Sequence, residues 1–382
     1  MGRWFYGLIV LSPVAFIART VALPDLLVFL LAAVSLIPLA GLIGRATEEL
    51  AHHLGPRAGG LLNATFGNAA ELIITLFAIH RGLLTLVKAS ITGAIIGNTL
   101  FILGMSLLVG GLRYKKQRFD AQDTSLNAAM MILAIAGLYL PATFAFTVRD
   151  PAIVENLSLL VAGVLLVTYG AYLAYVVLQG GPAAVPVAPT GDPPSPAGGE
   201  GRVRGSDLAA EVPPHADPRP EGEGTRWSTR RSLAVLGGAT VGAAVSSEVL
   251  VSAVEPVSGQ FGLSEFFVGA VVVALVGNAA EHFSAVQMAW RNRLDVSLAI
   301  TAGSSTQIAL FVAPLLVFAS ILLGHPMDLI FVPLELAILG VATALFAYIS
   351  VDGESNWLEG VQLLAIYLIA GFAFFLVPIQ HP

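Results

Sequence analysis

The sequence contains no cysteine among its 382 residues and is poor in charged residues. Without cysteine, the chain has no disulfide framework, no thiolate metal site and no cysteine nucleophile. Lys, Arg, Asp and Glu together make up only 12% of the residues, whereas soluble domains carry about 25%. A chain of this length with half the usual fraction of charged residues has too few of them to cover a surface that faces water. The composition therefore predicts a protein whose surface faces lipid.

The apolar residues, 56% of the chain, are gathered in long runs, and the mean hydropathy is +0.81. Segments such as 26–43 and 157–178 have few or no charges and are long enough to cross a hydrocarbon core of about 30 Å as helices. They lack the period-two alternation of barrel strands. We therefore expect an all-α integral membrane protein with about eleven transmembrane helices. The expected spans are 4–20, 25–45, 58–80, 86–111, 122–146, 153–179, 231–255, 264–290, 294–323, 327–349 and 357–379.

A segment of different composition separates the sixth expected span from the seventh. From 180 to 230 the chain is dense in Pro, Gly, Asp, Glu and Arg, with almost no branched or aromatic apolar residues. Such a composition cannot bury enough apolar surface to form a core. We expect a disordered linker here.

The distribution of basic residues predicts the orientation in the membrane, because Lys and Arg are enriched in cytoplasmic loops. With the N-terminus inside, the inner loops contain Arg3, Arg45, Arg57, Arg113, Lys115, Lys116, Arg118, Arg291 and Arg293, apart from the linker. The outer loops then contain only Arg19, Arg81, Lys88 and Arg149. The N-terminus and the arginine-containing linker are therefore expected in the cytoplasm.

An internal repeat is the most informative feature of the sequence. The five residues Gly-Asn-Ala-Ala-Glu occur at 67–71 and again at 277–281. Each half contains five expected spans, and an odd number of spans gives the two halves opposite orientations. Inverted repeats with a site at their interface are a recurring transporter architecture. The expected organisation is an extra N-terminal membrane helix at 1–22, a first five-helix repeat at 23–179, the linker at 180–230 and a second repeat at 231–382.

Glu71 and Glu281 lie well inside expected spans, at matching positions of the repeated motif. A charged residue at the centre of a membrane helix costs roughly 2.5–3.5 kcal/mol on insertion scales, so such residues are usually functional. The alternative is a structural carboxyl kept protonated or hydrogen-bonded inside the bundle. A symmetric pair within a five-residue identity favours the functional interpretation.

Each glutamate shares its helix face with a glycine and an asparagine one turn earlier, Gly67 and Asn68 or Gly277 and Asn278. Glycine weakens the helix and could free backbone carbonyls as ligands, or could simply allow close helix packing. Carboxylate, amide and carbonyl oxygens together suit a hard cation such as Ca²⁺, which takes 6–8 oxygen ligands.

Other polar residues are further candidates for the same site. Asn98 and Gln307 occupy matched places in the spans that follow the two motifs. Weaker candidates are the hydroxyls Ser304 and Ser305, which can also be interhelical contacts, and the carboxylates Glu48, Glu248 and Glu255, placed near the ends of their spans. The adjacent His52 and His53 are interpreted as interfacial rather than metal-binding, and His282 receives no firm role.

Several of these motifs carry a resemblance to a known family. They are the paired Gly-Asn-Ala-Ala-Glu motifs, Gly-Gly-Leu-Leu-Asn-Ala-Thr-Phe-Gly-Asn at 59–68 and Gly-Ser-Ser-Thr-Gln-Ile-Ala-Leu-Phe at 303–311. The sequence resembles the calcium/proton exchanger family of the cation/calcium antiporter superfamily over nearly all of both halves. The resemblance implies a ten-helix core plus one N-terminal helix, with Glu71 and Glu281 as central cation and proton ligands and Asn98 and Gln307 beside them. The linker departs from the family's acidic segment because it mixes acids with arginines.

The function expected from these observations is calcium/proton antiport. Two carboxylates balance one Ca²⁺ or two protons, so only loaded states are neutral and free to alternate between the two sides. Ca²⁺ is then exported from the cytoplasm, driven by the proton gradient, with Ca²⁺ as substrate rather than cofactor. The expected surroundings are lipid, in the plasma membrane of a prokaryote, with no nucleic-acid partner and no enzymatic activity. Alternatives are exchange driven by Na⁺, transport of Mn²⁺ or another divalent cation, and, more remotely, an intramembrane acid/base enzyme.

Overall fold

The computed structural model describes residues 7–148, 150–179 and 227–377, and these residues are mainly helical. The elements in chain order are η1 (Leu8–Val10), α2 (Leu11–Thr20), α3 (Asp25–Phe66), α4 (Ala69–His80), α5 (Leu84–Ile96), η2 (Gly97–Ile102), α6 (Leu103–Tyr114), β1 (Lys116–Arg118), α7 (Ala121–Thr147), α8 (Pro151–Gln179), α9 (Thr229–Phe261), α10 (Glu265–Phe267), η3 (Val268–Val273), α11 (Ala274–Gly277), α12 (Ala279–Trp290), α13 (Leu294–Gln307), η4 (Ile308–Val312), α14 (Ala313–Leu322), α15 (Pro333–Ile349), β2 (Glu354–Asn356) and α16 (Trp357–Phe375). The segments η2, η3 and η4 are π-helical turns.

Seven helices of the described part are long and apolar enough to cross a membrane. An eighth candidate is the bent pair Glu265–Gly277 and Ala279–Trp290, and three apolar helices are shorter: Leu8–Thr20, Ala69–His80 and Pro333–Ile349. These helices confirm the expected class, an α-helical integral membrane protein. The expected linker lies outside the described residues as far as residue 226.

Two expected span boundaries are wrong. The spans expected at 25–45 and 58–80 are not separated by a loop, because helix α3 runs through Asp25–Phe66, and the second of them is interrupted instead between Phe66 and Ala69. The residues between the two expected spans include Ala, Glu and Leu, which are strong helix formers. The span expected from residue 327 begins instead at Pro333, whose fixed φ suits the first turn of a helix.

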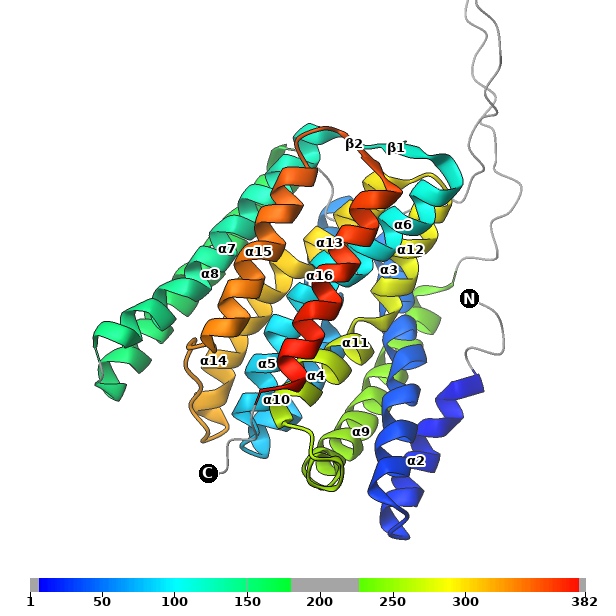
Figure 1. Cartoon of the computed structure of the whole chain (residues 1–382). Helices are drawn as coiled ribbons and strands as arrows, with labels where there is room; N and C mark the ends of the chain where they lie inside the picture. Colours follow the sequence, from blue (N-terminus) through cyan, green and yellow to red (C-terminus); the bar gives the residue numbers. More distant parts are fainter. Residues whose placement is uncertain (1–6, 149, 180–226, 378–382) are drawn as a thin grey trace, which may run out of the picture.

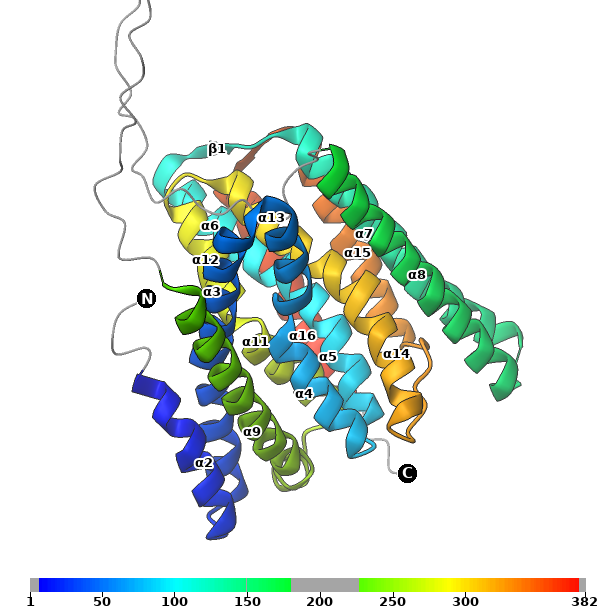
Figure 2. The same cartoon turned by 180° about the vertical axis from the view of Figure 1, so that it is seen from behind.

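The helices form a broad bundle with α2, α3 and α9 at one edge and α7 and α8 at the other (Figures 1 and 2). Buried serine hydroxyls connect helix α2 to α3 and α9 by hydrogen bonds. Ser246 of α9 donates to Ser12 of α2 at 2.8 Å, and Ser35 of α3 donates to Ser246 at 2.9 Å. Hydrogen bonds of this kind connect helices where lipid offers no hydrophobic driving force.

Glycines let the two halves of the chain approach each other at backbone distance in the centre of the bundle. A Cβ atom at Gly93 of α5 would lie 2.1 Å from the carbonyl oxygen of Ala270 in η3. A Cβ atom at Gly269 of η3 would lie 2.6 Å from the carbonyl oxygen of Leu86 in α5. Since neither position admits a side chain, the packing of α5 on η3 depends on both glycines.

A two-stranded antiparallel sheet closes one end of the bundle, which we call the sheet end. It pairs the loop after α6 with the loop before α16, and Lys116 Nζ lies 2.5 Å from Glu354 Oε1. The Lys116 ammonium lowers the pKa of the exposed Glu354 carboxyl by hydrogen bonding and by charge. The opposite end of the bundle, where α4 turns into α5, is called the α4–α5 end (Figure 1).

Trp227, just before α9, is docked on α3. The guanidinium groups of Arg45 and Arg231 pack on its ring, 4.9 Å and 4.7 Å from the ring centre. Its backbone N–H donates to Glu49 Oε2 at 3.2 Å, and its carbonyl oxygen lies 2.8 Å from His53 Nε2. The start of the second half of the chain is therefore held next to α3, and His53 takes part in this contact.

Candidate functional site

Both signature motifs interrupt a helix at their asparagine. The backbone of Asn68 has φ −104° and ψ 28°, and that of Asn278 has φ −91° and ψ 5°, both outside the α-helical region. A new helix starts at the next residue in each case, Ala69 or Ala279, and at the second break the axis bends by 61°. The repeated sequence thus forms the same local structure twice.

The break places each glutamate in the first turn of a new helix, Glu71 in α4 and Glu281 in α12. The N-terminus of a helix carries unsatisfied N–H groups and a partial positive charge, which stabilises carboxylates. The two helices leave the centre in opposite directions, α4 toward the α4–α5 end and α12 toward the sheet end (Figure 1). The two carboxyls are therefore presented to the centre of the bundle.

One carboxyl oxygen of each glutamate has no hydrogen-bond partner among the residues that the structure describes. Glu71 is 9% exposed and Glu281 is half-buried, yet Oε2 of both residues is buried and unpaired among the described residues. The Glu71 side chain also lies against Gly277, which precedes Glu281 by four residues in the second motif. An unsatisfied buried polar group costs about 1–3 kcal/mol, and more when charged. A bound cation, or protons, would therefore stabilise this pair of carboxyls.

Amide and hydroxyl groups from both halves of the chain form one hydrogen-bonded network at the helix breaks. Asn68 Nδ2 donates to Gln307 Oε1 at 2.7 Å, which joins the first motif to α13. Asn98 Nδ2 in η2 donates to Ser304 Oγ of α13 at 3.0 Å. Asn278 Nδ2 donates to the carbonyl oxygen of Ala274 at 3.0 Å. The four amides proposed from sequence thus come together at the helix breaks.

Ser304 is the centre of this network. Its hydroxyl lies 3.1 Å from Asn68 Oδ1 and 3.4 Å from Asn278 Oδ1, so it links both signature motifs. A single hydroxyl proton serves only one of these acceptors at a time. The other amide oxygen therefore remains available to a cation or to water.

The glycines of the motifs have different surroundings. Gly277, the last residue of α11, lies against the Glu71 side chain. Gly67 is half-buried in the turn between α3 and α4. Glycine at 277 therefore provides room for the opposite glutamate.

Four of the weaker candidates lie apart from this network. Ser305 donates to the carbonyl oxygen of Thr301 in its own helix at 2.8 Å. Glu48, Glu248 and Glu255 are exposed on α3 and α9. The expected position of Glu248 near a span end is wrong, because α9 extends over Thr229–Phe261 and places this residue in its interior.

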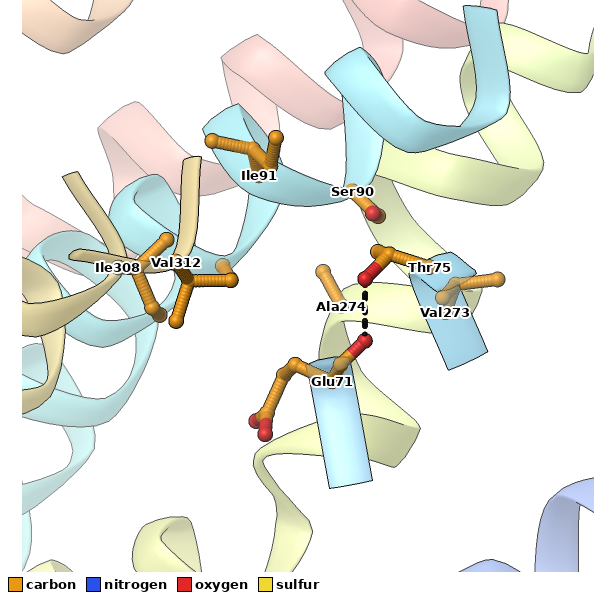
Figure 3. Close-up of a pocket in the computed structure, with 9 residues that line it drawn as sticks. Glu71, Thr75, Ser90, Ile91, Val273, Ala274, Ile308 and Val312 are labelled. Atoms are coloured by element: carbon orange, nitrogen blue, oxygen red, sulfur yellow. Dashed lines mark hydrogen bonds between the residues drawn. The ribbon is translucent and has the colours of Figure 1, made fainter. Parts of the chain in front are cut away.

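Sequence reasoning assigned no role to three residues that the structure places at the site. His282 Nε2 lies 3.1 Å from Asn98 Oδ1, so the imidazole continues the amide network. Thr75 and Ser90 line a small cavity beside Glu71 (Figure 3). His282 directly follows Glu281, and Thr75 lies one helical turn beyond Glu71. Their positions relative to the two glutamates were therefore the sequence signal that could have identified them.

The donor set is one of carboxylates and neutral oxygens. Within the described ranges, no three His, Asp or Glu side chains are grouped as a metal site. Two carboxylates with several amide and hydroxyl oxygens fit a hard cation bound reversibly.

The comparisons with known proteins agree with one another. The family model described as sodium/calcium exchanger protein matches residues 25–178 and 231–376. The Ca²⁺/H⁺ antiporter of Synechocystis sp. is 42% identical over 380 residues, covering 98% of this chain and 97% of that protein. The Ca²⁺/H⁺ antiporter ChaA of Bacillus subtilis is 39% identical, covering 99% and 100%. Among solved structures, the Ca²⁺/H⁺ antiporter protein YfkE is similar with a TM-score of 0.79 and 37% identity, covering 98% of this chain and 100% of that chain.

Proposed function

We propose that this chain, which belongs to the sodium/calcium exchanger protein family, exchanges Ca²⁺ for protons across a membrane. The names of the relatives support this activity, and the similarity extends over nearly the whole length of each. Calcium leaves the cytoplasm as protons enter, by alternating access at one central site. Glu71 and Glu281 bind either Ca²⁺ or protons.

The observation that carries the proposal is the pair of buried carboxyl oxygens, one on Glu71 and one on Glu281, that have no hydrogen-bond partner in the described part of the chain. Each glutamate belongs to the first turn of a helix that begins directly after the asparagine of its motif, and the asparagine amide is neutral at every physiological pH. Calcium would use both carboxylates with oxygens of Asn68, Asn278, Asn98 and Gln307. Protons would satisfy the same carboxyls when calcium is absent, so the two substrates compete.

The net charge of the two glutamates and their bound ions explains why exchange is obligatory. One Ca²⁺ or two protons neutralise the two carboxylates, whereas an empty, ionised pair leaves two charges in the bundle. The desolvation of such charges amounts to several kcal/mol per ion. Only the loaded forms then convert readily between the inward- and outward-facing states.

We further propose eleven membrane crossings, arranged as one N-terminal helix and two inverted five-helix repeats. The described helices support this number when the short helices Leu8–Thr20, Ala69–His80 and Pro333–Ile349 are counted as crossings or parts of crossings. The matched helix breaks at Asn68 and Asn278, with α4 and α12 leaving in opposite directions, support the inversion. The repeats are proposed at 23–179 and 231–382, joined by a linker at 180–230.

The proposed location is the plasma membrane of a prokaryote, with the sheet end in the cytoplasm. The basic residues of the sheet end, including Arg113, Lys116 and Arg293, support this orientation through the positive-inside rule. The α4–α5 end would then face outward.

The test is antiport by the full-length protein in everted membrane vesicles with an imposed pH gradient. We expect Ca²⁺ to dissipate the gradient in the absence of Na⁺, and Mg²⁺ to be a poorer substrate. Glu71→Gln and Glu281→Gln should each abolish exchange, because an amide neither releases a proton nor balances a divalent charge. Glu354→Gln, which alters an exposed carboxyl of β2, is the matched control and should retain exchange.

Each variant is also checked for a monodisperse peak in detergent, which separates lost transport from lost folding. Exchange that requires Na⁺ would favour a sodium-driven transporter, and a faster response to Mn²⁺ would change the assigned cargo. Near wild-type exchange by either glutamine variant would contradict the paired-carboxylate mechanism.

A further inference from the structure

A small cavity is lined by Glu71 and by residues of the neighbouring helices (Figure 3). One of them, Thr75, lies one turn beyond Glu71 along α4, which runs toward the α4–α5 end (Figure 1). Its polar lining consists of Glu71 and two hydroxyl residues, Thr75 of α4 and Ser90 of α5. The other lining residues are apolar: Ile91, Ala94, Val273, Ala274, Ile308 and Val312. The two hydroxyls are thus the only polar groups besides Glu71 among the residues that line this cavity.

Both hydroxyls keep free lone pairs. Thr75 Oγ1 donates to the carbonyl oxygen of Glu71 at 2.7 Å, and Ser90 Oγ donates to the carbonyl oxygen of Val87 at 2.9 Å. A hydroxyl has one proton to donate and two acceptor lone pairs, so each oxygen can still bind a cation or a water. Thr75 is 3% exposed and Ser90 is 6% exposed, which places these oxygens in the interior.

The second half of the chain lacks both hydroxyls. Ala285 occupies the position after Glu281 that Thr75 occupies after Glu71. Ser90 corresponds to Ala299 when Asn98 is matched with Gln307, and to Ile300 when the helix starts Leu84 and Leu294 are matched. If the side chains at residues 75 and 90 only filled space, alanine would suffice there as it does in the second half. The hydroxyls therefore distinguish one side of the site from the other.

We propose that Thr75 and Ser90 are transit ligands for the divalent cation on its way between Glu71 and the α4–α5 end. The inference rests on the proposed calcium/proton exchange. A cation that leaves the carboxylates through an apolar passage loses oxygen ligands before bulk water replaces them. The two hydroxyl oxygens, and waters held on them, supply ligands during that step. Thr75 and Ser90 therefore affect the rate at which the ion passes rather than the affinity of the central site for Ca²⁺.

The experiment compares variants of the full-length protein reconstituted in liposomes. Thr75→Val keeps the shape of the side chain without the hydroxyl, Thr75→Ser keeps the hydroxyl, and Ser90→Ala removes the second oxygen. Thr240→Val is the control, because this α9 hydroxyl makes the same kind of bond, to the Leu236 carbonyl oxygen at 2.8 Å, without lining the cavity. The exchange rate at saturating Ca²⁺ and the equilibrium Ca²⁺ affinity are both measured.

We expect Thr75→Val and Ser90→Ala to exchange about tenfold more slowly, with the Ca²⁺ affinity within about twofold of wild type. Thr75→Ser and Thr240→Val should exchange at the wild-type rate. Unchanged rates for Thr75→Val and Ser90→Ala would overturn the proposal, and so would a Thr75→Ser variant as slow as Thr75→Val. A parallel fall in affinity would make these residues part of the central site instead. Failure of the wild type to exchange Ca²⁺ for protons would refute the proposed function itself.

Discussion

Gly277 of the second signature motif lies against Glu71 of the first. A Cβ atom at residue 277 would be 3.0 Å from Glu71 Cγ and 3.3 Å from Glu71 Oε1. The glycine therefore has a role across the interface between the two halves, besides any effect on its own helix. Because a carboxyl of one motif occupies the space left by the other, the two motifs are positioned by each other.

The first prediction concerns this contact. Gly277→Ala should displace the Glu71 carboxyl by a few tenths of an ångström and weaken Ca²⁺ binding by about 1–2 kcal/mol, a factor of about 5–30. Calorimetry of the purified protein measures the affinity. Gly303→Ala is the matched control, since no atom lies within 4 Å of a Cβ atom there. Equal affinities for the two variants would show that the contact is unimportant.

The second prediction concerns the bond from Asn68 to Gln307. Asn68→Ala or Gln307→Ala leaves the other amide without its partner, so each should weaken Ca²⁺ binding by about 1–3 kcal/mol. The double variant should lose less than the sum, by about 0.5–3 kcal/mol, because the two side chains share one interaction. Strict additivity in this cycle would mean that the amides act independently.

Asn98→Ala should also weaken Ca²⁺ binding by about 1–3 kcal/mol, since the amide connects Ser304 with His282. Proton binding should remain largely in place in all amide variants, because amides do not titrate. The number of protons released when Ca²⁺ binds, measured by calorimetry in two buffers, checks this expectation.

The third prediction is a pH signature. If protons and Ca²⁺ compete for Glu71 and Glu281, the apparent Ca²⁺ affinity must fall as the pH drops through the titration of the pair. The dependence should exceed one proton per calcium where both carboxyls titrate together. Calorimetry at several pH values provides the measurement. An affinity that stays flat between acid and neutral pH would rule out competition at this site.

Glu354→Gln is the control for that pH series. Lys116 lowers the pKa of the Glu354 carboxyl below its ordinary value of 4.5, so this ion pair is intact above that pH. Its contribution is lost only as the pH falls through the lowered pKa. The variant should therefore show the same pH dependence of Ca²⁺ affinity as the wild type between acid and neutral pH.

The fourth prediction concerns the close approach of α5 and η3. Gly93→Ala should lower the stability by about 1–3 kcal/mol or more, because the new methyl group meets the Ala270 backbone. Gly97→Ala, a few residues further along the same span, meets no atom within 4 Å and should change stability by less than about 1 kcal/mol. Thermal unfolding in detergent compares the two. Equal melting temperatures would contradict backbone contact at Gly93.

The fifth prediction concerns the linker. Deletion of 183–223 should leave a folded, transporting protein, because the two halves assemble through their membrane helices. The deletion retains Trp227 and its contacts with Arg45 and Arg231. Loss of the monodisperse peak in detergent would contradict a passive tether, whereas an altered Ca²⁺ affinity with intact folding would indicate regulation.

The class of protein and the central carboxyls could be predicted from the sequence because both depend on local patterns. Lipid-facing helices require long apolar runs, and these are visible residue by residue. Glu71 and Glu281 stand out because each interrupts such a run within an identical motif. The identical motifs form the same local backbone, because both helices break at the corresponding asparagines.

Only the tertiary structure decided which polar groups meet. Asn68 and Gln307 are 239 residues apart, and their bond depends on how α13 crosses the break between α3 and α4. The π-helical turns η2 and η4 shift the direction of side chains in ways that a regular helical pattern does not foresee. Residue type and position in the span likewise placed Glu248 and Ser304 together among the weaker candidates, although one is exposed on α9 and the other joins both motifs. Composition and spacing determine which residues enter the membrane, whereas helix crossing and helix breaks determine which of them form the site.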